Sequence, residues 1–462
     1  MGNGYLALVA LGGVAAVIVA VTWLRIHPFV ALLTAAIGTG LAAGMAPADV
    51  IAAVTSGMGN TLGFVAIVVG LGSMFGMMLE ESGGAERLAA ALVKACGEAR
   101  TGLALGVVGF LVCIPVFLDV GIVMLLPLAV AAARRTGQPV TAYAFPMLAG
   151  MAVTHAFVPP TPGPTAVAQL LSADLGQVIA LGILTGLPTL AVAAWFSRRF
   201  LVPLAAGNPP LTKPNDRHAD AHGLQVIQPR LREPGVGLVL GLLLLPMLLI
   251  VGDTVARATL GAESTLARWL PLVGHPFTAL LIATLASFSF LGLRLGMPAG
   301  RIQQIAERAL EPAGVILLVT GAGGVFKQVL VDSGVGKVVA ASLAELPLST
   351  IVVAWLVAAV IRVLQGSATV AMITAAGLVA PLVESAGQPE PFAALVTLAI
   401  AAGATIASHV NDSGFWIVTR FLGLSTAESL RTWTVLETVI GVAGLGFVLI
   451  VHAVYGLSGA GG

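Results

Sequence analysis

Long runs of apolar residues, separated by short polar segments, follow one another along most of the chain. Most of these runs approach the length of about 20 residues that a helix needs to cross a bilayer. The pattern therefore predicts an all-α polytopic membrane protein. The apolar runs lie at about residues 4–24, 28–45, 60–79, 102–133, 141–171, 177–197, 235–252, 277–295, 312–330, 348–383, 391–418 and 433–454.

The composition agrees with this interpretation. The 462 residues are 58% hydrophobic and only 9% charged, whereas soluble domains carry about 25% charged residues. The net charge of +1 comes without any basic block, so we expect no nucleic-acid partner. The two cysteines, Cys96 and Cys113, show no metal-binding spacing. We expect neither a metal nor a cofactor.

The chain reads as two similar halves joined by a polar linker. The longest polar segment predicts a first transmembrane repeat at 1–202, a linker at 203–233 and a second repeat at 234–462. Related motifs then recur at nearly constant offsets. Gly72–Gly83 resembles Gly323–Gly334, and Thr154-His155 resembles Ser408-His409. Shared membrane-protein composition is the alternative explanation, but transporters often carry such repeats.

One apolar run in each half is too long for a single crossing. The run at 102–133 is interrupted by Pro115 and Leu118–Gly121, and its arms are too short to span the bilayer separately. We therefore predict a re-entrant hairpin here. Its counterpart, 348–383, is interrupted at Gln365–Thr369.

A second kind of interruption predicts one broken helix in each half. The stretch Ser408–Trp416 contains His, Asn, Asp and Gly within an apolar run, and a cluster of prolines occupies 159–165. Polar groups at membrane depth tend to mark a substrate or ion site. Each repeat then holds about five spanning helices, one re-entrant hairpin and one broken helix. Because an odd number of crossings reverses direction, the two repeats are predicted to have inverted topology.

The distribution of Lys and Arg predicts the orientation. With the N-terminus outside, the large majority of the 22 basic residues fall in cytoplasmic segments, as the positive-inside rule requires. We therefore expect a multi-pass protein of the cytoplasmic membrane with both termini periplasmic and the linker cytoplasmic.

The four interruptions predict one shared substrate site near mid-membrane. Each begins a half-helix, and Ser367, Thr369 and Asp412 suit the N-cap position. The free N–H groups and positive dipole end of such a helix favour an anion. Several such ends would hold a carboxylate without any buried Lys or Arg, while hydroxyls and amides bind a polyhydroxylated body. A packing face of small residues or a simple proline kink are the alternatives. The candidate substrate-binding residues are Thr161, Gly163, Thr165, Gly366, Ser367, Thr369, Asn411 and Ser413.

Ionisable residues within the apolar runs are candidates for proton coupling. A carboxylate beside an anion site is unfavourable unless it is protonated or paired, so Asp119 and Asp412 are candidate proton carriers. His155 and His409 are candidate relays, with an interhelical hydrogen bond as the alternative role. We favour Asp412, whose interruption is the more polar. Arg362 and Glu437 also fall within apolar runs.

Several of these stretches resemble the gluconate permease family, GntP, of bacterial proton symporters. The resemblance runs through nearly the whole chain. It implies uptake of gluconate or a related sugar acid across the bacterial inner membrane, driven by protons. It also implies paired hairpins, elevator-type movement and a homodimer. The matching stretches are THAFVPPTPGPTA at 154–166, GGVFKQVLVDSGV at 323–335, GSATVAMITAAG at 366–377, SHVNDSGFW at 408–416 and FLDVG at 117–121.

Other functions stay open at this point. The same scaffold suits another small carboxylate, such as glycerate, a hydroxybutyrate or a dicarboxylate, with sodium as the coupling ion. A channel would not need interrupted helices in both halves. An enzyme is not expected, because the chain lacks HExxH, P-loop and nucleophile-elbow motifs.

Overall fold

Helices form the regular secondary structure of the computed structural model throughout the residues that it describes. Eight helices in this part of the chain are long and apolar enough to cross a membrane. The prediction of an all-α polytopic membrane protein is therefore confirmed. The described residues are 3–96, 101–115, 118–205, 233–259, 269–270, 272–335, 338, 348–386, 388, 391–409 and 412–459.

The helices of the first half begin near the start of the chain and end before the polar linker. Their bounds are α1 Asn3–Thr22, α2 Pro28–Ala42, α3 Pro47–Glu81, α4 Gly84–Cys96, α5 Thr101–Val112, α6 Leu118–Thr136, α7 Thr141–Phe157, α8 Pro162–Leu170 and α9 Leu175–Phe196, followed by a π-helix at Ser197–Leu201 and α10 Val202–Leu204.

The helices of the second half follow a similar order of lengths and interruptions. Their bounds are α11 Val236–Thr259, α13 Pro276–Ser287, a π-helix at Phe288–Gly292, a 3-10 helix at Leu293–Leu295, α14 Ala299–Asp332, α16 Thr350–Gln365, α17 Ala368–Ala386, α18 Phe392–Gly403, α19 Ser413–Phe421, α20 Thr426–Arg431 and α21 Trp433–Gly459.

A shared helix start supports the equivalence of the two halves. The tripeptide His-Pro-Phe opens both α2 and α13. In each case Nδ1 of the histidine, His27 or His275, accepts a hydrogen bond of 3.3 Å from the backbone N–H of the phenylalanine. Proline at the first helical position has no N–H to leave unpaired. This third repeated motif was not predicted from the sequence.

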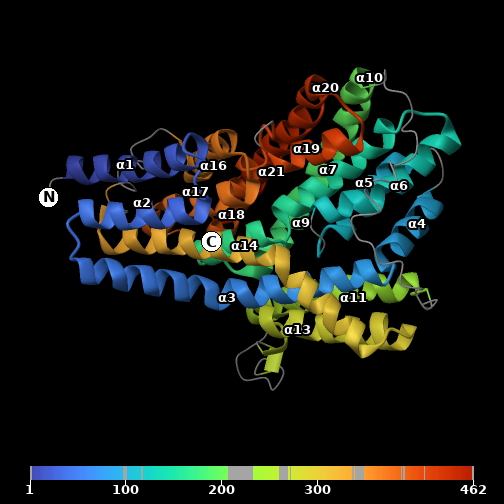
Figure 1. Ribbon diagram of the computed structural model, residues 1–462, viewed down its shortest axis with the longest axis horizontal. Coiled ribbons are helices and arrows are strands. Elements are labelled where there is room, and N and C mark those ends of the chain that lie inside the picture. Colours follow the sequence, from blue (N-terminus) through green and yellow to red (C-terminus); the bar gives the residue numbers. More distant parts are fainter. Residues whose placement is uncertain are drawn as a thin grey trace.

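The two longest helices, α3 and α14, lie side by side in opposite directions (Figure 1). Glu81 at the end of α3 pairs with Arg301 and Arg308 near the start of α14. With 35 and 34 residues, each is about 50 Å long at 1.5 Å per residue. The apolar runs at 60–79 and 312–330 predicted only the more hydrophobic part of each helix, because hydropathy alone does not show that the helix also includes the more polar part before it.

Glycines allow α3 and α14 to approach closely. A Cβ at Gly324 would lie 2.0 Å from Thr61 Oγ1 and 2.7 Å from the Gly57 carbonyl oxygen, whereas a Cβ at Gly314 on the same helix meets nothing within 4 Å. Gly324→Leu should therefore lower the midpoint of thermal unfolding in detergent, since overpacking costs about 1–3 kcal/mol. Gly314→Leu is the matched control. Equal midpoints for the two variants would contradict the close packing.

Both predicted hairpins are interrupted close to the predicted positions, but Leu118–Gly121 form the first turn of α6, and Ala368 and Thr369 begin α17. The first breaks between Val112 and Leu118, and the second breaks at Gly366 and Ser367. The 12 residues of α5 extend only about 18 Å, against a hydrocarbon thickness of about 30 Å. Gly366 has φ +90° and its N–H bonds to the Arg362 carbonyl at the end of α16. A side chain is disfavoured in that conformation.

The two broken helices differ in detail from the prediction. The first break is shorter, because Pro162 starts α8 and the residues up to Thr165 are helical. Proline is well tolerated in a first helical turn. The second break is longer, since α18 ends at Gly403 and α19 begins at Ser413. The wide polar gap beside α19 leaves more side chains near its start.

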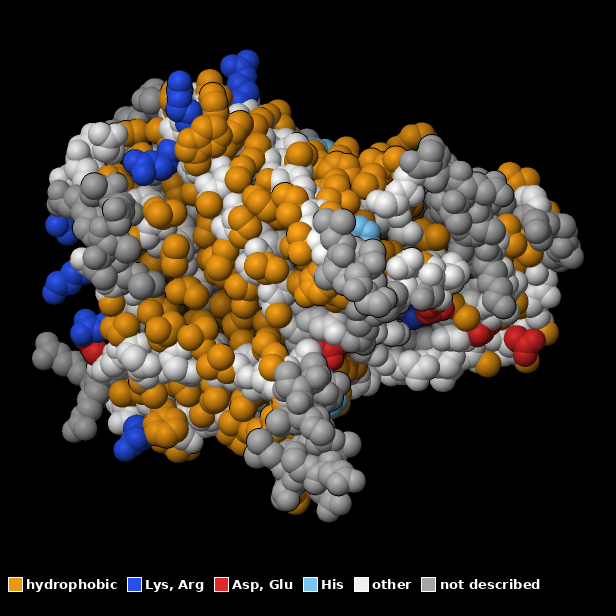
Figure 2. Space-filling model, turned by 180° about the vertical axis from the view of Figure 1, so that it is seen from behind, with side chains coloured by type: hydrophobic (Ala, Val, Ile, Leu, Met, Phe, Trp, Pro, Cys, Tyr) orange, Lys and Arg blue, Asp and Glu red, His pale blue; other side chains and the backbone are white. Residues whose placement is uncertain are grey.

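The surface is consistent with a lipid environment. Hydrophobic side chains cover the middle of the face in Figure 2, and Lys and Arg gather toward one end of it. The helices α4, α6 and α10 lie at this end in Figure 1, and α4, α6 and the π-helix directly before α10 carry basic residues. The predicted linker, 203–233, lies almost entirely outside the described residues. The domain boundaries and the inverted topology remain predictions.

Candidate functional site

A cavity of about 220 Å³ opens where three of the four interruptions meet. Its wall is formed by the tips of the two predicted hairpins, by α7, by the start of α19 and by α21. The residues that line it are Leu118, Ile122, Ala152, His155, Ala156, Arg362, Ser367, Ala368, Thr369, Met372, Thr405, Asp412, Gly414, Ile417, Trp433 and Glu437.

An ion pair crosses from the second hairpin to the second broken helix. Nη2 of Arg362 donates to Oδ2 of Asp412 at 2.6 Å, with the two side chains 2% and 12% exposed. Arg362 lies in the last turn of α16, where the helix dipole favours a cation. Asp412 is the N-cap of α19 and accepts from the Gly414 N–H at 3.0 Å. The pair therefore joins one helix end to another.

A hydrogen-bond chain fixes the orientation of Asp412. The Ser408 hydroxyl donates to Oδ2 of Asp412, and Nε1 of Trp433 donates to the Ser408 hydroxyl at 2.8 Å. The Thr434 hydroxyl donates to the Ser408 carbonyl. These contacts tie the start of α21 to the gap before α19. The carboxylate thus has a defined position beside the cavity.

Two donors of Arg362 have no acceptor within the part of the chain that the structure describes. Nε and Nη1 are both buried and lack a hydrogen-bond partner there, as does Oε1 of Glu437. A buried guanidinium with unmatched donors is unfavourable, because desolvation is not offset by new hydrogen bonds. Unpaired donors on a cation that lines a cavity are the arrangement that an anionic ligand satisfies.

The start of α17 faces the same cavity. Ser367 accepts from the Val370 N–H at 3.4 Å and so serves as the N-cap, as its residue type predicted. Thr369 lies in the first turn of α17, and both side chains line the cavity. Gly366 is buried at the junction that ends α16. These three candidate residues are therefore brought together.

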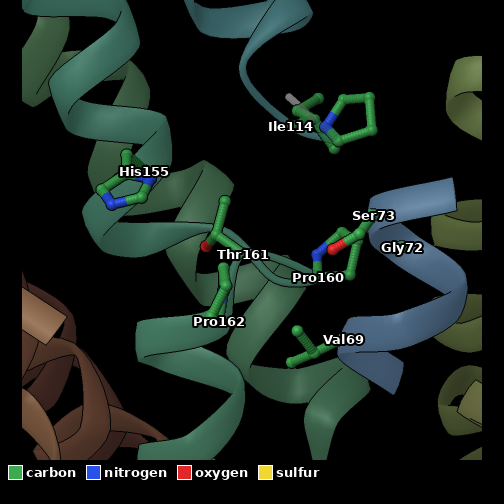
Figure 3. A pocket seen from close by; sticks show the side chains of 9 residues that line it. Val69, Gly72, Ser73, Ile114, His155, Pro160, Thr161 and Pro162 are labelled. Carbon is green, nitrogen blue, oxygen red and sulfur yellow. The ribbon is translucent and has the colours of Figure 1, made fainter. Parts of the chain in front are cut away.

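The candidate residues of the first broken helix lie elsewhere. The Thr161 hydroxyl donates to the Val158 carbonyl at 2.7 Å. Thr161 lines a second, much smaller cavity of about 20 Å³ (Figure 3). A Cβ at Gly163 would meet Met372 Sδ at 2.6 Å, so this glycine allows α8 to pack against α17. Thr165 is fully buried and lines neither cavity.

The small cavity adjoins the larger one at His155. Figure 3 shows Thr161 between His155 of α7 and Ser73 of α3, with Pro160 beside Ser73. His155 lines both cavities. His409 does not line the larger cavity, and its Nε2 lies 3.0 Å from the Val363 carbonyl.

The structure does not describe the side chains of three candidate residues. Asp119 and Ser413 lie at the starts of α6 and α19, but their side chains fall outside what the structure describes. Asn411 lies outside the described residues altogether. Their assigned roles remain predictions.

The prediction that helix ends could hold a carboxylate without a buried Lys or Arg stays a prediction, but a buried cation, Arg362, does line the cavity. The sequence showed Arg362 and Glu437 within apolar runs, and that signal alone marks them as candidates. Their meeting across the cavity depends on tertiary packing, which no local pattern reports. Trp433 gave no polar signal in the sequence.

Comparison with known proteins identifies the family. The sequence matches the GntP family permease over residues 5–454. The chain belongs to the GntP permease family. It is 40% identical to the low-affinity gluconate transporter of Escherichia coli strain K12, over 95% of this chain and 96% of that protein. It is 37% identical to the gluconate permease of Pseudomonas aeruginosa strain PAO1, over 98% of each.

A solved structure shows the same fold. The crystal structure of the YdaH transporter of Alcanivorax borkumensis, described as having an unusual topology, matches with a TM-score of 0.66. The match covers 91% of this chain and 97% of that chain at 17% identity. The relatives in the GntP permease family are permeases and transporters. This member is accordingly a multi-span membrane transporter of the gluconate type rather than an enzyme.

Proposed function

We propose that this GntP permease carries gluconate or a closely related sugar-acid anion into the cell together with protons. The observation that carries the proposal is Arg362, a buried cation that lines the cavity and keeps two donors without protein acceptors. The similarity to gluconate transporters supports the choice of substrate. Arg362 holds the substrate carboxylate, and Asp412 holds Arg362 in place.

The remaining walls suit a polyhydroxylated body. The N-terminus of α17 presents free N–H groups and a positive dipole end to the anion. Ser367, Thr369 and Thr405, which carry hydroxyl groups, line the cavity. In the proposed complex Trp433 and Met372 of the same wall contact the carbon chain. In this arrangement the carboxylate lies toward Arg362 and the hydroxyls of the sugar acid lie toward α17.

Elevator-type movement is the mechanism that we propose for alternating access. Two inverted repeats explain why the equivalent helices α3 and α14 lie antiparallel, with an ion-pair cluster at Glu81. The long α3–α14 pair acts as the fixed element, and the hairpin tips carry the substrate site past it. We place the protein in the bacterial inner membrane as a homodimer, with a cytoplasmic linker and periplasmic termini.

Uptake into proteoliposomes tests the proposed function directly. An imposed pH gradient, acid outside, should drive labelled gluconate above its external concentration. A sodium gradient of the same size should not. Competition with glycerate, a hydroxybutyrate, a dicarboxylate and other sugar acids then ranks the substrates. Uptake that follows only sodium, or that ignores gluconate, would favour the alternative of another small carboxylate.

The N-terminus of α17 provides a prediction about affinity. Ser367→Ala or Thr369→Val should raise the apparent KM for gluconate by roughly one to two decades, since a lost charge-assisted bond costs about 1.5–3 kcal/mol. Labelled uptake over a range of gluconate concentrations measures this. Thr397→Val is the control, because Thr397 is buried in α18 and its hydroxyl donates to the Ala393 carbonyl. Wild-type KM in both α17 variants would refute the role.

Labelling of single cysteines tests the proposed topology. In a background without Cys96 and Cys113, Asp220→Cys in the linker should resist an impermeant thiol reagent in intact cells and react after permeabilisation. Asn3→Cys near the N-terminus should react in intact cells. The reverse pattern would overturn the orientation.

A further inference from the structure

Glu437 is a buried carboxyl group in the wall of the cavity. It lies one helical turn after Trp433 on α21, is 6% exposed and lines the cavity beside Arg362 and Asp412. Its Oε1 has no hydrogen-bond partner among the described residues. An ionisable side chain at this depth is energetically unfavourable, so its presence usually marks a site for a transported ion or substrate.

Among the described residues, three other charged or titratable groups line the cavity with Glu437. Arg362 comes from α16, Asp412 from the start of α19 and His155 from α7. The Asp119 side chain at the first hairpin tip is not described. Asp412 has four functions at once: it binds Arg362, accepts from Ser408, caps α19 and faces the cavity. Glu437 is the cavity carboxyl that such contacts leave available.

The charge of the cavity then determines what must accompany an anion. With His155 neutral, Arg362, Asp412 and Glu437 give the empty cavity a single net negative charge. Binding an anion alone would double that charge in a buried space, which is strongly unfavourable. Binding an anion and one proton restores the original value. The loaded and the empty carrier then cross the membrane with equal charge.

We propose that Glu437 binds the proton that crosses with each substrate anion. This inference rests on the proposed function and replaces Asp412 as the carrier, because Asp412 is already paired with a guanidinium. The proton joins a Glu437 oxygen when the site faces outside and returns to water when the site faces inside. While protonated, the carboxyl donates a hydrogen bond to a substrate hydroxyl, so proton and anion favour each other's binding.

Glu437→Gln, which mimics the protonated carboxyl, separates exchange from accumulation. Purified protein in proteoliposomes should still exchange labelled for unlabelled gluconate at equilibrium, although at an altered rate. It should lose accumulation driven by a pH gradient. Calorimetry in buffers of different ionisation enthalpy should show that the wild type takes up a proton with gluconate and that the variant does not.

The outcomes distinguish this inference from the proposed function. Glu307→Gln, on the exposed face of α14, should accumulate gluconate like the wild type. If the wild type itself fails to transport gluconate, the proposed function fails. If the wild type accumulates gluconate and Glu437→Gln does so equally, only the assignment of Glu437 fails. A folded Glu437→Gln protein that neither binds nor exchanges gluconate would also overturn it.

A measurement on the wild type covers the case in which the variant does not fold. Dicyclohexylcarbodiimide reacts with protonated carboxyl groups in apolar surroundings. Mass spectrometry should find the adduct on the peptide that contains Glu437, with more adduct at lower pH, and none on Asp412. An adduct on Asp412 with Glu437 unmodified would mean that Asp412, and not Glu437, binds the proton, and would refute the proposal.

Discussion

Arg362→Gln should abolish measurable gluconate transport. The substitution removes the cation that lines the cavity and leaves Asp412 buried without its partner at 2.6 Å. Breaking one side of a buried pair costs about 3–5 kcal/mol, and the lost contacts to the substrate carboxylate add to this. Binding of gluconate to the purified variant, measured as a Kd, should weaken by more than roughly a hundredfold. Arg362→Lys should recover only part of the affinity, because an ammonium group lacks the planar fork.

Two further variants show whether the loss of transport in Arg362→Gln is caused by unfolding alone. Arg308→Gln is the surface control, since Arg308 is 61% exposed in its pair with Glu81, and exposed pairs contribute little. The double variant Arg362→Gln/Asp412→Asn removes both charges, so its thermal midpoint should recover relative to the single variant. Its transport should not recover. Wild-type affinity in folded Arg362→Gln protein would refute the role of Arg362.

The positions of the helices along the chain were largely predictable from the sequence. Apolar runs of sufficient length and helix breakers such as Pro115 and Gly366 act locally, so they can be recognised without the fold. The extra length of α3 and α14 was missed, because hydropathy reports the apolar part of a helix and not its more polar continuation. The two His-Pro-Phe motifs are too short to be recognised as helix caps from the sequence alone. Their capping role becomes clear only from the observed hydrogen bonds.

The candidate site was predictable only in part. Ser367 and Asp412 were recognised as N-caps, since capping depends on residue type and a helix start beside it. Thr161 and Gly163 make a local hydrogen bond and a packing contact that the sequence did not indicate, and their substrate role stays a prediction. The pairing of Arg362 with Asp412 joins residues 50 positions apart. Neither residue's sequence neighbourhood indicates the other.

Asp412→Asn should make the empty protein less stable and more dependent on its substrate. Asparagine still caps α19 and accepts from the Gly414 N–H, so the helix start is preserved. The buried Arg362 charge, however, loses its counter-ion, at a cost of about 3–5 kcal/mol. The thermal midpoint without substrate should therefore fall below that of the wild type. Asp412→Ala should fall further, because the cap is lost as well.

Gluconate should then partly replace the missing carboxylate. When its carboxylate pairs with Arg362, it supplies the counter-ion that Asp412→Asn lacks, so saturating gluconate should raise the thermal midpoint more in this variant than in the wild type. A neutral analogue, the corresponding sugar alcohol, should not produce the larger shift, because it brings the hydroxyls without the charge. An equal or smaller shift with gluconate would mean that the substrate carboxylate does not bind Arg362, since a ligand stabilises a protein only through its affinity for the folded state.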